Sequence, residues 1–133
     1  MKRILLCLIC IFSLLGSKAQ SYNELVEKAM DYTFKDSLQQ AEELFREALR
    51  LDPYNARNAL LFSNLGTVLK RQGKIDEAID SYTMALNITP YATAILLNRA
   101  TLYMEKNLTE KAYLDYCDVV DLFPNDKEAR LFR

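Results

Sequence analysis

The chain of 133 residues has no histidine and no tryptophan, and only three residues each of glycine, proline and cysteine. Without histidine it lacks the most common general base and the most common zinc ligand. Three scattered glycines cannot build the glycine-rich loop that holds a phosphate. These absences argue against acid–base catalysis, a metal site and nucleotide binding. We therefore expect no catalytic residues, no metal and no cofactor.

Carboxylates are plentiful, but their surroundings do not resemble an active site. Glu42 and Glu43 lie at helical spacing from Arg46 and Arg50. Such neighbours form weak ion pairs of about 0.2 to 0.5 kcal/mol on solvated helix faces. The acidic residues therefore predict a solvated helix surface, not a catalytic pair.

The first 19 residues have a basic start, a twelve-residue apolar run from Ile4 to Leu15 and a small residue at Ala19. This order is typical of a secretory signal peptide, here cut after Ala19. The apolar run is shorter than the about 20 residues of a membrane span. We expect a bacterial protein that is exported, periplasmic or secreted, with no membrane span after cleavage.

Two alternatives for this segment stay open: an uncleaved anchor and a lipoprotein leader. The second is disfavoured because neither Cys7 nor Cys10 is preceded by the small residues of lipoprotein sites. Cleavage after Ala19 would leave Cys117 as the one cysteine, so an intrachain disulfide is excluded. It would also leave about four more acidic than basic residues, which disfavours nucleic-acid binding because phosphate-binding surfaces are basic.

The main positive feature is a residue pattern written three times, each copy ending at a proline. Taking Pro53, Pro90 and Pro124 as the reference, the same types recur at fixed distances upstream. An alanine stands twelve residues before each proline, an aromatic residue eight before, and a small apolar residue five before: Ala41, Ala78 and Ala112; Phe45, Tyr82 and Tyr116; Ala48, Ala85 and Val119. Fixed-period self-similarity of this length indicates a repeat protein.

Within each copy the apolar residues recur every three or four positions, which predicts two amphipathic helices per copy. Turn-forming residues separate the helices at Asp36-Ser37, Gln72-Gly73-Lys74 and Asn107. Ser37 with Gln40 also has the spacing of a helix capping box. Small residues mark the places where paired helices must approach closely: Ala29, Gly66 and Ala100 on the first helices, and Ala41, Ala78 and Ala112 on the second.

These residues resemble the tetratricopeptide repeat family, whose unit is a helix-turn-helix of 34 residues. The second copy carries the family pattern almost throughout; the third departs from it at Arg99 and the first at Lys28, where leucine is usual. In the second copy the matching residues are Phe62, Leu65, Gly66, Leu69, Gly73, Ala78, Tyr82, Ala85 and Pro90. The resemblance implies an all-α fold, an α-solenoid of antiparallel helix-turn-helix repeats in a right-handed superhelix.

The pattern divides the chain into five parts. A signal peptide occupies residues 1–19, and the repeats occupy residues 21–54, 55–92 and 93–126. The second repeat contains a three-residue insertion near its start. Residues 127–133 read as the start of a fourth repeat or as a C-terminal cap.

If the family geometry holds, the first helices of the copies line a concave groove that binds peptides or proteins. The expected groove residues are Asn23, Val26, Met30 and Thr33 in the first copy; Leu60, Ser63, Asn64, Thr67 and Arg71 in the second; and Ala94, Leu97, Asn98, Thr101 and Glu105 in the third. Asn64 and Asn98 occupy equivalent positions and are candidates to hydrogen-bond a ligand main chain.

One subfamily holds the C-terminal carboxylate of chaperones with a clamp of lysine, asparagine and arginine side chains. At the aligned positions this chain has Val26, Met30, Asn64, Ala94 and Asn98, of which only Asn64 agrees. The resemblance therefore does not imply a carboxylate clamp.

These observations favour a non-catalytic exported adaptor or scaffold that binds a peptide or protein partner in its groove. One alternative is a self-association or spacer module of a longer envelope protein, forming a homo-oligomer through an exposed terminal repeat face. Another is an accessory domain of an enzyme encoded beyond Arg133. The sequence does not decide among these three functions and does not identify the partner, because function cannot be taken from the fold alone.

Overall fold

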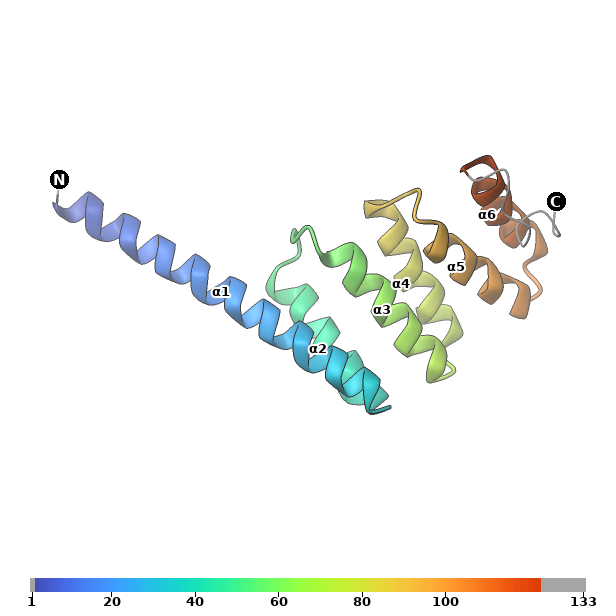
Figure 1. The fold of residues 1–133 in the computed structure, drawn as a ribbon, viewed down its shortest axis with the longest axis horizontal. Helices are drawn as coiled ribbons and strands as arrows, with labels where there is room; N and C mark the ends of the chain where they lie inside the picture. Colours follow the sequence, from blue (N-terminus) through green and yellow to red (C-terminus); the bar gives the residue numbers. More distant parts are fainter. Residues whose placement is uncertain (1, 123–133) are drawn as a thin grey trace. The chain divides into compact units, whose positions relative to one another are not determined.

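In the computed structural model, which describes residues 2–122 apart from the side chains of residues 14 and 15, every element is an α-helix. The chain divides into two compact units, Met1–Asn55 and Ala56–Arg133. Figure 1 labels the six helices: α1 (Lys2–Phe34), α2 (Leu38–Leu51), α3 (Asn58–Arg71), α4 (Ile75–Ile88), α5 (Thr93–Glu105) and α6 (Thr109–Leu122). The predicted all-α solenoid class is confirmed.

The helices pair in sequence order. In the first unit α1 packs against α2, and in the second α3 packs against α4 and α5 against α6, while α4 also contacts α5. The second unit thus contains two hairpins that stack through α4 and α5. The predicted breaks between the first and second helices are all present.

The three turns inside the hairpins have the same geometry. Asp36, Gly73 and Asn107 have φ angles of 61°, 78° and 59°, in the left-handed region. In each turn a backbone amide donates to the carbonyl five residues earlier, as from Lys74 to Leu69 at 2.9 Å. This is the bond that ends a helix through a left-handed residue, and glycine, asparagine and aspartate tolerate that conformation best.

The small residues meet between paired helices, as predicted. Ala29, Ala41, Ala78, Ala100 and Ala112 have no exposed surface. Gly66 is the tightest position: a Cβ atom added there would lie 2.8 Å from both Cδ1 and Cε1 of Tyr82. The absence of a side chain at Gly66 therefore lets the buried ring of Tyr82 lie directly on α3.

One local expectation is wrong. Ser37 stands at the N-terminus of α2, but its side chain makes no capping hydrogen bond, so the predicted capping box does not form. The helix α1 runs without a break from Lys2 to Phe34, so the expected cleavage point after Ala19 lies within a helix and stays a prediction. Residues 16–20 contain only one glycine and no proline, so nothing in their backbone chemistry stops a helix.

Candidate functional site

The expected groove residues of the first unit differ in exposure. Asn23 is exposed and Met30 is 45% exposed on α1. The hydroxyl of Thr33 donates to the carbonyl of Ala29 at 2.8 Å. Val26, by contrast, is only 4% exposed. Val26 is thus a core residue, and it offers no surface to a ligand.

On α3 the expected groove residues lie along the side that is not fully buried. Leu60 is 54% exposed, Arg71 is exposed, and Ser63 and Asn64 are half-buried. Their neighbours Leu61 and Leu65 are buried. The helix thus presents an apolar side chain at one end, a cation at the other and polar groups between them.

Thr67, also expected in the groove, has a structural role. Its hydroxyl lies 2.9 Å from the hydroxyl of Tyr82 and 3.2 Å from the carbonyl of Ser63. Burial raises the pKa of Tyr82, and the hydrogen bond from Thr67 offsets part of that rise. Thr67 therefore supplies the polar partner that a buried tyrosine hydroxyl needs.

On α5 the expected groove residues are mostly accessible. Ala94, Thr101 and Glu105 are exposed, and Leu97 and Asn98 are half-buried. Leu97 packs partly against the cluster of Ala100, Ala112 and Tyr116. Because α5 presents an aliphatic side chain next to an amide, this side of the helix can offer both an apolar contact and hydrogen bonds.

Arg99, which stands out in the sequence only as a departure from leucine, bonds to two other helices of the second unit. Its Nε and Nη2 atoms donate to the two carboxylate oxygens of Asp115 on α6 at 2.9 and 2.6 Å. Its Nη1 atom donates to the hydroxyl of Thr83 on α4 at 3.1 Å. The carboxylate of Asp115 raises the pKa of Arg99, so this cation joins three helices and stays charged.

An aromatic ring lies beside this ion pair. The guanidinium carbon of Arg99 lies 5.5 Å from the ring centre of Tyr103, and the Nζ of Lys111 lies 5.8 Å from it. Both distances are within the range of a cation–π contact. The arrangement of Arg99, Asp115, Thr83 and Tyr103 is hereafter the Arg99 cluster. Because Arg99 donates to Asp115 on α6 and to Thr83 on α4, we interpret the cluster as a packing element that links α4, α5 and α6.

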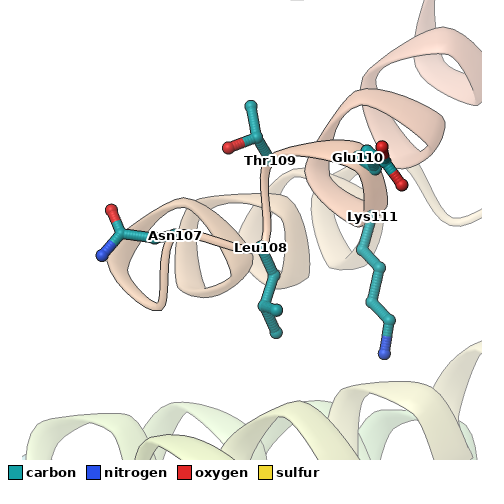
Figure 2. A pocket seen from close by; sticks show the side chains of 5 residues that line it. All are labelled: Asn107, Leu108, Thr109, Glu110 and Lys111. Carbon is teal, nitrogen blue, oxygen red and sulfur yellow. The ribbon is translucent and has the colours of Figure 1, made fainter.

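Hollows occur at the turn between α5 and α6. One, of about 430 Å³, is lined by residues 107–111, and Figure 2 shows Leu108 and Lys111 extending to one side of the turn and Thr109 to the other. A second, of about 410 Å³, is lined by Thr109, Glu110, Tyr113 and Leu114. Neither hollow coincides with the predicted groove on α3 and α5. The exposed apolar residues of α6 were not among the predicted site residues.

Two comparisons identify related sequences. A family model described as tetratricopeptide repeat matches residues 18–90. Human DnaJ homolog subfamily C member 7 is 40% identical over 77 residues, which make up 57% of this chain and 16% of that protein. A Giardia intestinalis relative, named as a UDP-N-acetylglucosamine–peptide N-acetylglucosaminyltransferase, is 34% identical over 68 residues, or 51% of this chain and 5% of that protein. Members of the family are in general non-catalytic adaptors, but this transferase is named as an enzyme, and the chain spans less than a fifth of the length of either relative.

Solved structures match over more of the chain. A tetratricopeptide repeat protein from Parabacteroides merdae is 46% identical with a TM-score of 0.81, over 83% of this chain and 43% of its own. The first tetratricopeptide domain of Spaghetti (RPAP3), bound to the HSP90 peptide SRMEEVD, is 25% identical with a TM-score of 0.72, over 84% of this chain and 86% of that domain.

The expected export is wrong. DnaJ homolog subfamily C member 7 and RPAP3 are cytosolic tetratricopeptide proteins, and no comparison indicates a periplasmic or secreted protein. The signal-peptide assignment on which that expectation rested has no support from them either. An apolar run near the N-terminus is not specific to a signal peptide, because helices with other roles can carry the same composition.

Proposed function

Because the chain belongs to the tetratricopeptide repeat family, we propose that it is an adaptor that binds a peptide segment of a protein partner along the exposed sides of α3 and α5. Repeat proteins of this kind bind other proteins, and the related RPAP3 domain is bound to an HSP90 peptide. The observation that carries the proposal is the matched pair Asn64 and Asn98, each half-buried at the same position of successive first helices.

The chemistry of the two helices supports an extended peptide with an apolar anchor. Leu60 and Leu97 supply aliphatic surface, and the two asparagines supply amide donors and acceptors for a ligand main chain. Extended peptides gain affinity from main-chain hydrogen bonds and specificity from alternate side chains in apolar contacts. We therefore propose an internal segment of the partner as ligand.

A terminal carboxylate is not the proposed ligand. The aligned clamp positions Met30 and Ala94 carry no charge, and Val26 is buried. A carboxylate bound without a cation loses the charge-assisted hydrogen bonds that make such sites strong. The peptide SRMEEVD therefore serves as a probe: we expect it to bind this chain at least about 100-fold more weakly than a selected internal peptide.

The direct test selects ligands from a library of displayed twelve-residue peptides with the full chain and measures the affinity of the selected peptides by calorimetry. Asn64→Glu and Asn98→Glu should each weaken binding about fivefold or more, since one lost hydrogen bond is worth about 1 kcal/mol or more. Asn87→Glu is the matched control, because Asn87 is an exposed asparagine on α4.

Melting temperatures of the three variants separate lost binding from lost folding. If the selected peptides bind the Asn64 and Asn98 variants as well as the Asn87 variant, the groove assignment is wrong. Tight binding of SRMEEVD would contradict the internal-segment ligand while leaving the groove in place.

A second candidate function, self-association, is favoured by the outer side of α6. Leu114 and Tyr113 are 62% and 44% exposed, and they line the 410 Å³ hollow. Ile79, which is equivalent to Tyr113 in the preceding hairpin, is only 9% exposed, and the counterpart of Leu114 is the exposed, charged Asp80. Light scattering over a concentration series tests it: a dimer that Leu114→Glu returns to a monomer would support it, and a monomer throughout would contradict it.

A further inference from the structure

The first part of α1 carries large apolar side chains that nothing in the described chain covers. The exposed fractions lie between 48% and 74% for Ile4, Leu5, Leu6, Leu8, Ile9, Ile11 and Phe12. The most apolar 18-residue window of α1 is 0% buried. So large an apolar surface is strongly unfavourable in water.

These side chains surround the helix and do not form a stripe. With 3.6 residues per turn, residues 4, 5, 6 and 8 already point to different sides, and Cys7 and Cys10 fill the remaining sector. A protein groove covers one face of an amphipathic helix, whereas a helix that is apolar all round needs surroundings on every side. A lipid bilayer provides such surroundings.

The charges at both ends of this segment fit a bilayer. Lys2 and Arg3 precede the apolar run and Lys18 follows it, with no charged residue between them. From Arg3 to Lys18 the helix rises about 22 Å, against about 30 Å for a hydrocarbon core. Long basic side chains reach the headgroup region from within the membrane edge, so the three cations can remain hydrated while the apolar residues are buried.

The helix then continues into the first hairpin. The same unbroken α1 buries Tyr22 and Ala29 at 1% and 0% exposure. No turn separates these packed residues from the apolar run, so a bound run would be joined directly to the first hairpin.

From this geometry we propose that residues 2–19 of α1 are retained and anchor the chain in a lipid bilayer. By length and composition α1 is able to cross a membrane, a property that a cleaved leader near the N-terminus would share. The anchor and the leader differ in one respect: the anchor stays attached to the chain, and the leader does not.

The test uses the full chain purified in detergent and mixed with vesicles of phosphatidylcholine and phosphatidylglycerol. After detergent removal, flotation through a density gradient measures the membrane-bound fraction. The unaltered chain should float with the vesicles. The double variant Leu8→Asp with Ile9→Asp should lower the partition coefficient at least about 100-fold, because one aspartate in a membrane helix costs about 3 kcal/mol.

Phe34→Asp is the matched control. Phe34 is 92% exposed near the other end of the same helix, so its loss removes an equally accessible apolar group outside the proposed anchor. The control should float like the unaltered chain. Circular dichroism and melting of all three proteins show whether the hairpins remain folded.

Three results would overturn the proposal. The first is an unaltered chain that stays at the bottom of the gradient, including one that forms an oligomer through α1 instead. The second is equal loss of flotation in the Phe34 control. The third is an intact mass, measured on chain recovered from its producing cells, that corresponds to cleavage after Ala19. Mass beginning at residue 1 or 2 in the membrane fraction supports the anchor.

Discussion

The two hairpins of the second unit use different chemistry at equivalent positions. In α3–α4 the paired positions are Leu65 and Ser81, which are 2% and 6% exposed. In α5–α6 they are Arg99 and Asp115, which form a bidentate ion pair. The hydroxyl of Ser81 donates to the carbonyl of Phe62 at 2.7 Å, whereas Arg99 reaches as far as Thr83 on α4.

The comparison shows that the same two positions of the hairpin hold a leucine and a serine in one copy and an ion pair in the next. The charged version also bonds to the preceding hairpin. An ion pair of this kind contributes little net stability over a well-packed apolar pair, but removing one partner is costly. The ion pair of α5–α6 therefore mainly links that hairpin to α4. It is not expected to make α5–α6 much more stable than α3–α4.

The largest expected effect comes from removing the carboxylate of the charged hairpin. Asp115→Ala leaves Arg99 partly buried without its anion and should lower the free energy of unfolding by about 3 kcal/mol. The double variant Arg99→Leu with Asp115→Ser copies the apolar hairpin and should recover most of that loss. Chemical denaturation of the three proteins measures both quantities, and a double variant as unstable as Asp115→Ala would contradict the equivalence of the two hairpins.

The next largest effect is expected at Gly66 in the α3–α4 hairpin, where the glycine lets the ring of Tyr82 approach α3 closely. Gly66→Ala places a methyl group 2.8 Å from the Tyr82 ring, so it should destabilise the chain by about 1 to 3 kcal/mol through overpacking. Gly16→Ala is the control, since nothing lies within 4 Å of its added Cβ. Thermal unfolding with equal shifts for both variants would show that the ring moves away without cost.

A smaller effect is expected at the turns, where the hairpins share one geometry with different residues. Gly73→Ala puts a Cβ on a residue with φ of 78° and should cost about 1 to 2 kcal/mol. Asn107→Gly changes a residue with φ of 59° and should alter stability by less than about 1 kcal/mol. Urea denaturation of both variants measures the difference, and equal costs at the two turns would argue against left-handed strain as its cause.

A pH effect of similar size is expected from Tyr82. Burial raises the pKa of Tyr82 in the folded chain, so the unfolded chain releases this proton first, from about pH 10 upward. Stability is therefore complete below about pH 10 and falls above it, by at most about 1.4 kcal/mol per pH unit. Tyr82→Phe should be less stable at neutral pH by about 1 kcal/mol and should lose less stability on going to pH 11; an unchanged alkaline loss would contradict this assignment.

The smallest effect is expected for the pair of Lys106 and Asp76, which links the end of α5 to the start of α4. Asp76 has a side chain that is 77% exposed, and exposed ion pairs contribute about 0 to 1 kcal/mol. Asp76→Asn should therefore shift the melting temperature much less than Asp115→Ala. A comparable shift would show that exposed and buried pairs contribute equally here.

Much of the fold could be predicted from the sequence because its signals are local. The left-handed turn residues and the small residues each act within one hairpin, and the structure places them as expected. Pro53 and Pro90 follow the ends of α2 and α4, and Pro124 lies outside the described residues. The ion pair of Arg99 was not predicted, since its partner stands 16 residues away. The packing of α5 against α6 brings the two side chains together. The sequence did contain one sign of this ion pair, because Arg99 stands where the repeat pattern usually has leucine. A search of the paired helix of the same copy for an acidic residue would have found Asp115.

The remaining errors arise where local rules meet packing. Val26 was placed in the groove by alignment, yet it is buried. Alignment gives a residue's position along a helix, but it does not say which other side chains cover that residue. Ser37 has the residue type of a cap, yet its side chain makes no such bond. The groove residues themselves stay a prediction, since no bound peptide tests them.

The continuity of α1 has a mechanical consequence. At about 1.5 Å per residue its 33 residues form a rod close to 50 Å long, and the hydrogen-bonded backbone resists bending more than a loop does. A force or tilt applied near Lys2 would reach the packed residues around Ala29 with no slack to absorb it, so the first hairpin would bear any load placed on the far end of the rod.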